Sequence, residues 1–191
     1  HSKVAEEAFV AAGYGMHRRE IMYNDFIIVG PSADPAGVVA AKTVIDAFQR
    51  IAVNQSTFIS RGDDSGTHKK ELSLWSAAQL DPATFVFWYK SVGAGMGASL
   101  NSASAMDGYI MSDRASWLNF GNKGNLKLLF AGDSKLFNQY AYLPVSPDRY
   151  AHVKARAAPA LENWLVSPRA KQIINGYNIG GGALFVFNAR P

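Results

Sequence analysis

The chain has 191 residues, of which 48% are hydrophobic and 12% aromatic, so it can bury a substantial core. Its basic residues outnumber its acidic residues by 19 to 15 and are scattered, which favours anionic ligands only weakly and does not indicate nucleic-acid binding. The absence of cysteine excludes disulfides, thiolate chemistry and cysteine-ligated zinc. No apolar run approaches the roughly 20 residues that span a bilayer, so we expect no membrane span.

Apolar periodicity predicts helices and strands in alternation, which is the pattern of an α/β protein. The predicted elements, in chain order, are a helix over 1–13, a strand over 21–29, a helix over 34–48, a strand over 58–59, a helix over 65–78, an apolar aromatic stretch over 85–89, a helix over 99–106, a strand over 109–111, a helix over 113–120, a strand over 126–130, an extended segment over 137–145, helices over 153–165 and 168–177, and an apolar segment over 184–187. The residues predicted to lie in the core include Trp75, Trp88, Trp117 and Trp164.

Two long extended segments lie on either side of a compact run of helices and strands. This arrangement is typical of a chain that passes from one lobe to another and back. We therefore predict a first lobe made of residues 1–25 and 140–191, a second lobe made of residues 26–139, and crossover strands near 21–29 and 137–145. Clefts between lobes are common ligand sites.

The segment Ser60–Glu71 places a glycine-rich turn at the predicted start of a helix. A strand-like stretch precedes it and a helical pattern follows, so Asp64 or Ser65 is the expected N-cap. Free N–H groups at a helix start lie at the positive end of the helix dipole and suit an anion. The residues expected to present them are Gly66, Thr67 and His68.

Side chains of the same segment add further hydrogen-bond donors. Arg61 supplies a planar fork of N–H groups that suits an anion with several oxygens. Hydroxyl donors are expected from Ser60, Ser65 and Thr67. The segment therefore predicts a pocket for a small oxyanion. The alternative is an ordinary capped loop, in which His68 only caps and solvates the helix.

Several longer motifs give the chain a resemblance to a known family. These motifs are Arg18–Pro31, Ser60–Lys70, Gly95–Gly97, Tyr109–Arg114, Asn138–Tyr140 and Trp164–Pro168. Together they resemble the tungstate-binding proteins of ABC transporters, almost from one end of the chain to the other. The resemblance implies an α/β, two-lobed periplasmic-binding-protein-like fold of type II with mixed sheets.

The resemblance also implies a function. It implies high-affinity capture of a tetrahedral metal oxyanion, tungstate or molybdate, and its delivery to an ABC permease. It also implies that the binding protein lies in the periplasm or outside the cell. It implies no cofactor and no enzyme activity, and we expect a monomer. Family members usually open with a strand and a Thr/Ser-rich loop. This sequence shows no such strand and loop before its first predicted helix, so the first lobe is expected to lack its N-terminal segment.

The binding residues that the resemblance carries over by position are Ser60, Arg61, Ser65, Gly66, Thr67 and His68. No metal ion is expected to be ligated directly, because the oxyanion is held through Arg61, Ser65 and Thr67. Tyr140, on the returning crossover strand, is a further candidate, with packing as the alternative. Arg114 is a second candidate cation, unless it pairs with an acidic neighbour.

Asp63 bears on which anion is bound. Tungstate and molybdate are fully deprotonated at neutral pH, so a site for them offers only donors, whereas hydrogen phosphate carries a proton that it can donate to one carboxylate. If Asp63 pairs with Arg61 or turns outward, metal oxyanions are favoured. If Asp63 faces inward, a phosphate-binding protein of the same superfamily is the alternative.

A second alternative is an NAD-dependent enzyme. The turn Gly93–Gly97, followed by Ala98, fits the dinucleotide-binding fingerprint, and Asp113 follows at the expected spacing. The pattern is short and common, and no proton-relay histidine lies near it in the sequence. A tight turn before a helix, which also presents N–H groups to the ligand, is the simpler interpretation.

Overall fold

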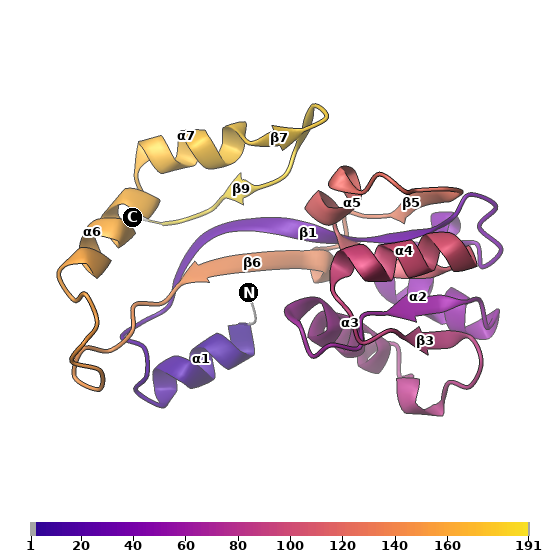
Figure 1. The fold of residues 1–191 in the computed structure, drawn as a ribbon, viewed down its shortest axis with the longest axis horizontal. Coiled ribbons are helices and arrows are strands. Elements are labelled where there is room, and N and C mark those ends of the chain that lie inside the picture. The colour runs from indigo at the N-terminus through magenta and orange to yellow at the C-terminus, as the bar shows by residue number, and fades with distance from the viewer. Residues whose placement is uncertain (1–2, 191) are drawn as a thin grey trace. The chain divides into compact units, whose positions relative to one another are not determined.

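The computed structural model describes residues 3–190, which form two compact units (Figure 1). One unit contains residues up to Asn24 and from Asn138 onward, and the other contains residues Asp25–Phe137. The chain therefore passes between the units within strand β1 (Arg19–Pro31) and within strand β6 (Phe137–Tyr142).

The unit Asp25–Phe137 is built on a mixed sheet with strand order β3-β2-β4-β1-β5. The strands other than β1 are β2 (Phe58–Ser60), β3 (Tyr89–Ser91), β4 (Tyr109–Asp113) and β5 (Leu126–Phe130). Strand β2 is parallel to β3 and β4, whereas β1 is antiparallel to β4 and β5. The carboxyl ends of β2, β3 and β4 therefore meet at one edge of the sheet. A helix follows each of these ends.

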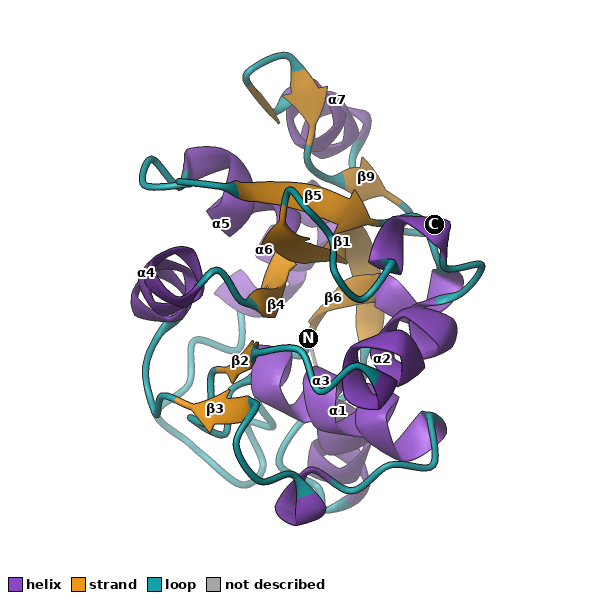
Figure 2. Ribbon diagram, turned by 90° about the vertical axis from the view of Figure 1, so that its right-hand side faces the viewer, coloured by secondary structure: helices purple, strands orange, loops and turns teal. Residues whose placement is uncertain are grey.

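Helices cover both faces of this sheet, as the end-on view shows (Figure 2). They are α2 (Val44–Val53), α3 (Gly66–Ala77), α4 (Met96–Met106) and α5 (Arg114–Asn119). In β1, Phe26 and Ile28 pack into one core with α2 and α3. The alternate residues Ile27 and Val29 pack into a second core with α4 and α5. A strand buried on both faces is continuously apolar, which explains the run Phe26–Val29.

Trp75 on α3 forms the centre of the larger core. Its side chain is fully buried, and aromatic rings surround it, with the Phe48 centroid at 4.4 Å and the Phe58 centroid at 5.2 Å. Phe85 and Trp88 approach the same ring from the loop before β3. These contacts attach α3 to the sheet and thereby position the first turn of the helix.

The other unit contains few buried apolar residues. Its elements are α1 (Lys3–Ala11), α6 (Ala157–Leu165), α7 (Pro168–Gly176), β7 (Asn178–Ile179), β8 (Gly182–Ala183), β9 (Val186–Phe187), β6 and the start of β1. Strand β9 pairs with β1, and side-chain amides join the strands, because Asn138 donates to Asn24 at 2.8 Å and Asn188 to Gln139 at 2.7 Å. Helix α1 has no buried residue.

Two predicted helices begin later than the sequence pattern indicated. Residues 34–43 form turns and the short 3₁₀-helix η1 (Val38–Ala40), because Asp34 and Gly37 have positive φ. The Asp34 carboxylate accepts from the N–H groups that follow it, and Thr43 is the true N-cap of α2. The predicted helix over 153–165 begins only at Ala157.

The apolar aromatic stretch 85–89 is strand only at Tyr89, a 3₁₀-helix η2 (Pro82–Thr84) precedes it, and Phe87 is 83% exposed. One core prediction was wrong. Of the four tryptophans, Trp164 is 48% exposed and is not a core residue. The sequence pattern did not indicate the β7–β8 hairpin. The remaining 3₁₀-helix of the described residues is η3 (Ser134–Leu136).

Candidate oxyanion site

The predicted oxyanion segment joins β2 to α3 at the carboxyl edge of the sheet. Strand β2 ends at Ser60, and α3 begins at Gly66. Ser65 is the N-cap, with extended backbone and an Oγ that accepts from the His68 N–H at 3.3 Å. The prediction of a helix start with Asp64 or Ser65 as N-cap is confirmed.

Positive φ angles at Gly62 and Asp64 turn this loop back over the strand end. The loop packs directly on the connection between β3 and α4. The Ala94 N–H donates to the Arg61 carbonyl at 3.1 Å, and a Cβ at Gly62 would lie 1.8 Å from Ser91 Oγ. Glycine suits this position because its φ is positive, and a Cβ there would force the Ser91 side chain to move.

Replacement of Gly62 by alanine is therefore expected to disturb the loop. The positive φ alone costs roughly 1–2 kcal/mol for an L-residue, and the contact with Ser91 adds to it. We expect a lower melting temperature and weaker oxyanion binding. Gly121→Ala is the matched control, because a Cβ there meets no atom within 4 Å. Equal melting temperatures for the two variants would contradict this account.

Arg61 is the first residue of the loop, and its side chain is 17% exposed. One of its terminal nitrogens forms an ion pair with Asp63, whereas its Nε is buried without a hydrogen-bond partner among the described residues. The second oxygen of Asp63 accepts from the Ser65 N–H at 3.2 Å. Although burial raises the pKa of the Asp63 carboxyl, hydrogen bonds from Ser65 and Arg61 outweigh it and lower the pKa to about 2.

The helix start presents fewer free amides than the sequence suggested. Within residues 3–190, the N–H groups of Gly66 and Thr67 have no hydrogen-bond partner. The prediction of a free N–H at His68 was wrong, because this N–H donates to Ser65 Oγ. The His68 ring also serves the loop, because Nδ1 accepts from the Asp64 N–H at 3.1 Å. This bond leaves Nε2 as the ring nitrogen able to donate.

A second helix start lies at the same edge of the sheet. Gly95 is the N-cap of α4, and the turn before it begins at Gly93, which has positive φ. The first N–H groups of α4, at residues 96–98, have no hydrogen-bond partner within the described part of the chain. Two helix dipoles and one guanidinium thus provide positive potential and free donors along neighbouring strand ends, which suits an anion.

Ser60 and Thr67 are both buried. The Ser60 side chain is fully buried, and its Oγ has no hydrogen-bond partner of normal geometry, although it lies close enough to Glu71 to lower the pKa of that carboxyl. Thr67 is 6% exposed. The buried carboxyl group of Glu71 was not foreseen from the sequence. Its spacing of four residues from Thr67, on an otherwise apolar face, was the available signal.

The two remaining candidates have partners of their own. Arg114 binds Asp25 through both Nε, at 2.7 Å, and a terminal nitrogen, so the acidic neighbour that the sequence left open is present. The hydrogen bond to Asp25 raises the pKa of the Arg114 guanidinium further. Tyr140 belongs to the other compact unit, where its hydroxyl accepts from Asn138 at 3.2 Å and its ring packs edge-on against Phe185.

The glycine turn before α4 lacks the surroundings of a dinucleotide site. Such a site places its acidic residue at the end of the strand beside the turn. Here β3 is paired in the main sheet with β2 alone, and Asp113 ends β4, on the far side of β2. The Asp113 carboxylate caps α5 by accepting from the Ser116 N–H at 2.8 Å. The geometry therefore does not favour NAD.

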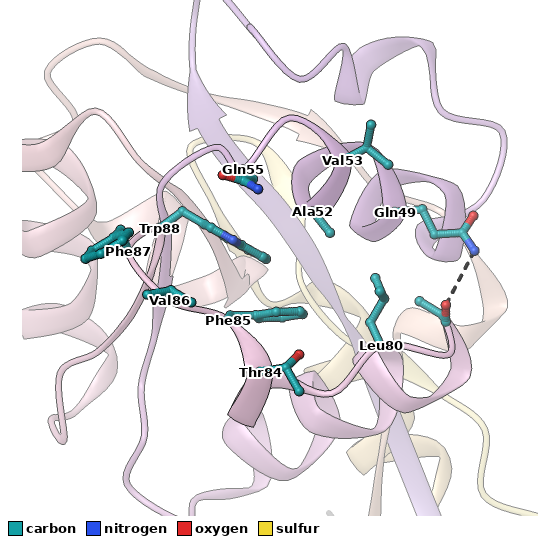
Figure 3. Close-up of a pocket in the computed structure, with 11 residues that line it drawn as sticks. Gln49, Ala52, Val53, Gln55, Leu80, Thr84, Phe85, Val86, Phe87 and Trp88 are labelled. Atoms are coloured by element: carbon teal, nitrogen blue, oxygen red, sulfur yellow. Dashed lines mark hydrogen bonds between the residues drawn. The ribbon is translucent and has the colours of Figure 1, made fainter.

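A groove of about 790 Å³ lies at the opposite, amino edge of β2 and β3 (Figure 3). Phe85, Leu80 and Trp88 form much of its wall, and no charged side chain lines it. An apolar groove gives no compensation for the hydration that an oxyanion loses. Residues 3–190 also contain no cluster of three metal-ligating side chains and no helix suited to cross a membrane.

The chain is similar to known proteins along most of its length. A family model described as a PBP superfamily domain matches residues 1–169. The chain is 42% identical to the tungstate-binding protein TupA of Peptoclostridium acidaminophilum, over 99% of this chain and 67% of that protein. It is 41% identical to a putative ABC transporter anion-binding protein of Haloferax volcanii, over 99% of this chain. The chain spans 56% of the length of the Haloferax volcanii protein.

A solved structure is similar over the whole chain. The tungstate-binding protein TupA from Desulfovibrio alaskensis G20 is 42% identical, with a TM-score of 0.89. The match covers 100% of this chain and 77% of that one.

Proposed function

The chain belongs to the PBP superfamily and, within it, to the family of TupA tungstate-binding proteins, and on this premise we propose that it captures a tetrahedral oxyanion, tungstate or molybdate. It then delivers the anion to the permease of an ABC transporter. The fold predicted from the sequence, an α/β periplasmic-binding-protein-like fold with a mixed sheet, is confirmed.

One observation carries the proposal for this chain. The starts of α3 and α4 lie at the same edge of the sheet, with free N–H groups at Gly66, Thr67 and residues 96–98 within the described part of the chain, and the loop that leads from β2 into α3 holds Arg61. Backbone donors at helix ends bind oxyanions without any reorganisation of side chains. The carried-over residues Ser60, Ser65 and His68 support this cradle from the same loop.

The Asp63 carboxylate supports a metal oxyanion over phosphate. One of its oxygens is paired with Arg61, and the other accepts from the Ser65 N–H. With a pKa of about 2 it remains ionised, so only its engagement within the loop keeps it from accepting the proton of hydrogen phosphate. Both oxygens are engaged within the loop, which leaves a set of donors for a fully deprotonated dianion. Phosphate binding is the alternative that the experiment below separates.

Further parts of the proposal concern the setting of the protein. It works in the periplasm or outside the cell, as a monomer, and it performs no chemistry on its ligand. The partner is the permease subunit, and no cofactor is needed. Relatives named as tungstate-binding, anion-binding and ABC transporter proteins support the oxyanion ligand and the permease partner.

A thermal-shift series tests the proposal. Tungstate and molybdate are expected to raise the melting temperature, because a ligand at about 100 times its Kd stabilises the native state by about 2.7 kcal/mol. Sulfate, phosphate and NAD are expected to have little effect at the same concentration. A shift with phosphate alone would favour the phosphate-binding alternative, and a shift with NAD alone would overturn the proposal.

A further inference from the structure

A buried carboxyl group lies one helical turn below the proposed cradle. Glu71 follows Thr67 by four residues on the inner face of α3, so their Cβ atoms are about 5–6 Å apart. Glu71 is only 2% exposed. Its Oε1 accepts from the Tyr89 hydroxyl at 2.7 Å and from the Trp75 indole N–H at 3.2 Å.

None of these neighbours neutralises the carboxylate. Among residues 3–190 no Lys, Arg or His forms an ion pair with Glu71, and the groups around it are the hydroxyls of Tyr89 and Ser60 and the indole of Trp75. Tyr89, the titratable group in contact, stays neutral because burial and the Glu71 charge raise its pKa. The other titratable groups at this end of α3 are His68, Lys69, which pairs with Asp64, and Lys70, and none of them forms an ion pair with Glu71 within residues 3–190.

Burial is the main reason why the pKa of Glu71 is raised to about 7, and the hydrogen bonds from Tyr89 and Trp75, together with the nearby Ser60 hydroxyl, offset only part of this effect. The carboxyl group therefore changes charge near neutral pH. A dianion placed above an ionised Glu71 is repelled, since little water screens the two charges.

We propose that Glu71 couples oxyanion binding to proton uptake, so that the anion is held by the form of the protein in which Glu71 is neutral. This inference rests on the proposed function and adds a regulation to the same site. Glu71 acts from beneath the cradle through its charge, without touching the ligand.

The expected pH dependence follows from linkage. In the free protein Glu71 is protonated below about pH 7 and ionised above it. Bound dianion raises its pKa further, because it stabilises the neutral form. Between the two pKa values, binding takes up one proton and the Kd rises about tenfold for each pH unit. Affinity is therefore highest at low pH and falls as the pH rises through 7.

Calorimetry with micromolar tungstate between about pH 6.5 and about pH 9 tests the inference. The wild-type Kd is expected to rise with pH, and the binding heat to vary with the ionisation heat of the buffer as one proton is taken up. In Glu71→Gln the side-chain oxygen can still accept from Tyr89 and Trp75, but the amide does not titrate. The Kd of this variant is therefore expected to be independent of pH. Asp107→Asn, an exposed residue of the same unit in left-handed conformation, is the matched control and should behave as wild type.

The outcomes separate the two proposals. Absence of tungstate binding at every pH would overturn the proposed function and this inference with it. Tight binding with a constant Kd and no proton uptake would overturn the inference alone. Retention of the wild-type pH dependence in Glu71→Gln would assign the proton to another group and would also overturn the inference.

Discussion

Replacement of Arg61 by alanine is expected to weaken tungstate binding at least about a hundredfold while the fold stays intact. The guanidinium is the cation of the loop, and its removal also leaves the Asp63 carboxylate without its ion-pair partner, so the site changes from donor-rich to net negative. The lost donors and the new repulsion act in the same direction. Isothermal titration calorimetry measures the loss, and circular dichroism checks the fold.

Two further variants make this result specific. Arg61→Lys keeps the charge but loses the planar fork, so an intermediate affinity is expected. Arg50→Ala removes an arginine of the same unit that pairs with Asp46 on α2, and it should bind as wild type. Unchanged affinity in Arg61→Ala would exclude the loop 61–65 as the anion site.

Replacement of Trp75 by alanine is expected to give the largest loss of stability. The indole is fully buried among the rings of Phe48, Phe58 and Phe85, and truncation of a large aromatic side chain in a core costs about 3–5 kcal/mol. The cavity would lie directly under α3. Urea unfolding, followed by fluorescence or circular dichroism, measures the change in the free energy of unfolding.

Trp164→Ala is the matched control for this loss. Trp164 is 48% exposed, so its truncation removes little buried contact and should change the free energy of unfolding by less than about 1 kcal/mol. Equal losses for the two tryptophans would mean that the ring cluster around Trp75 does not form the core of its unit.

Local signals explain which parts of the fold were predictable. The start of α3 was predicted because Ser65 and Gly66 are cap and first-turn residues whose preference acts over three or four positions. The strand with Phe26–Val29 was predicted because burial on both faces demands a continuous apolar run. The helix predicted from residue 34 failed because Asp34 and Gly37 adopt left-handed backbone, so their turn replaces the first helical turns.

Contacts between distant segments were beyond such signals. The pairing of Arg114 with Asp25 joins residues 89 positions apart, and it decides that this arginine is not a free cation. The exposure of Trp164 likewise depends on what packs against α6 and not on its apolar neighbours in sequence.

Local sequence patterns were enough to predict the α/β class, the start of α3 and the loop with Arg61, because capping, glycine turns and apolar periodicity act between residues close in the chain. The contact between the loops after β2 and β3, which brings two helix starts to one edge of the sheet, depends on how the strands pair. The burial of Glu71 beneath them also depends on the folded chain, because it is set by which strand and which rings a helix face meets.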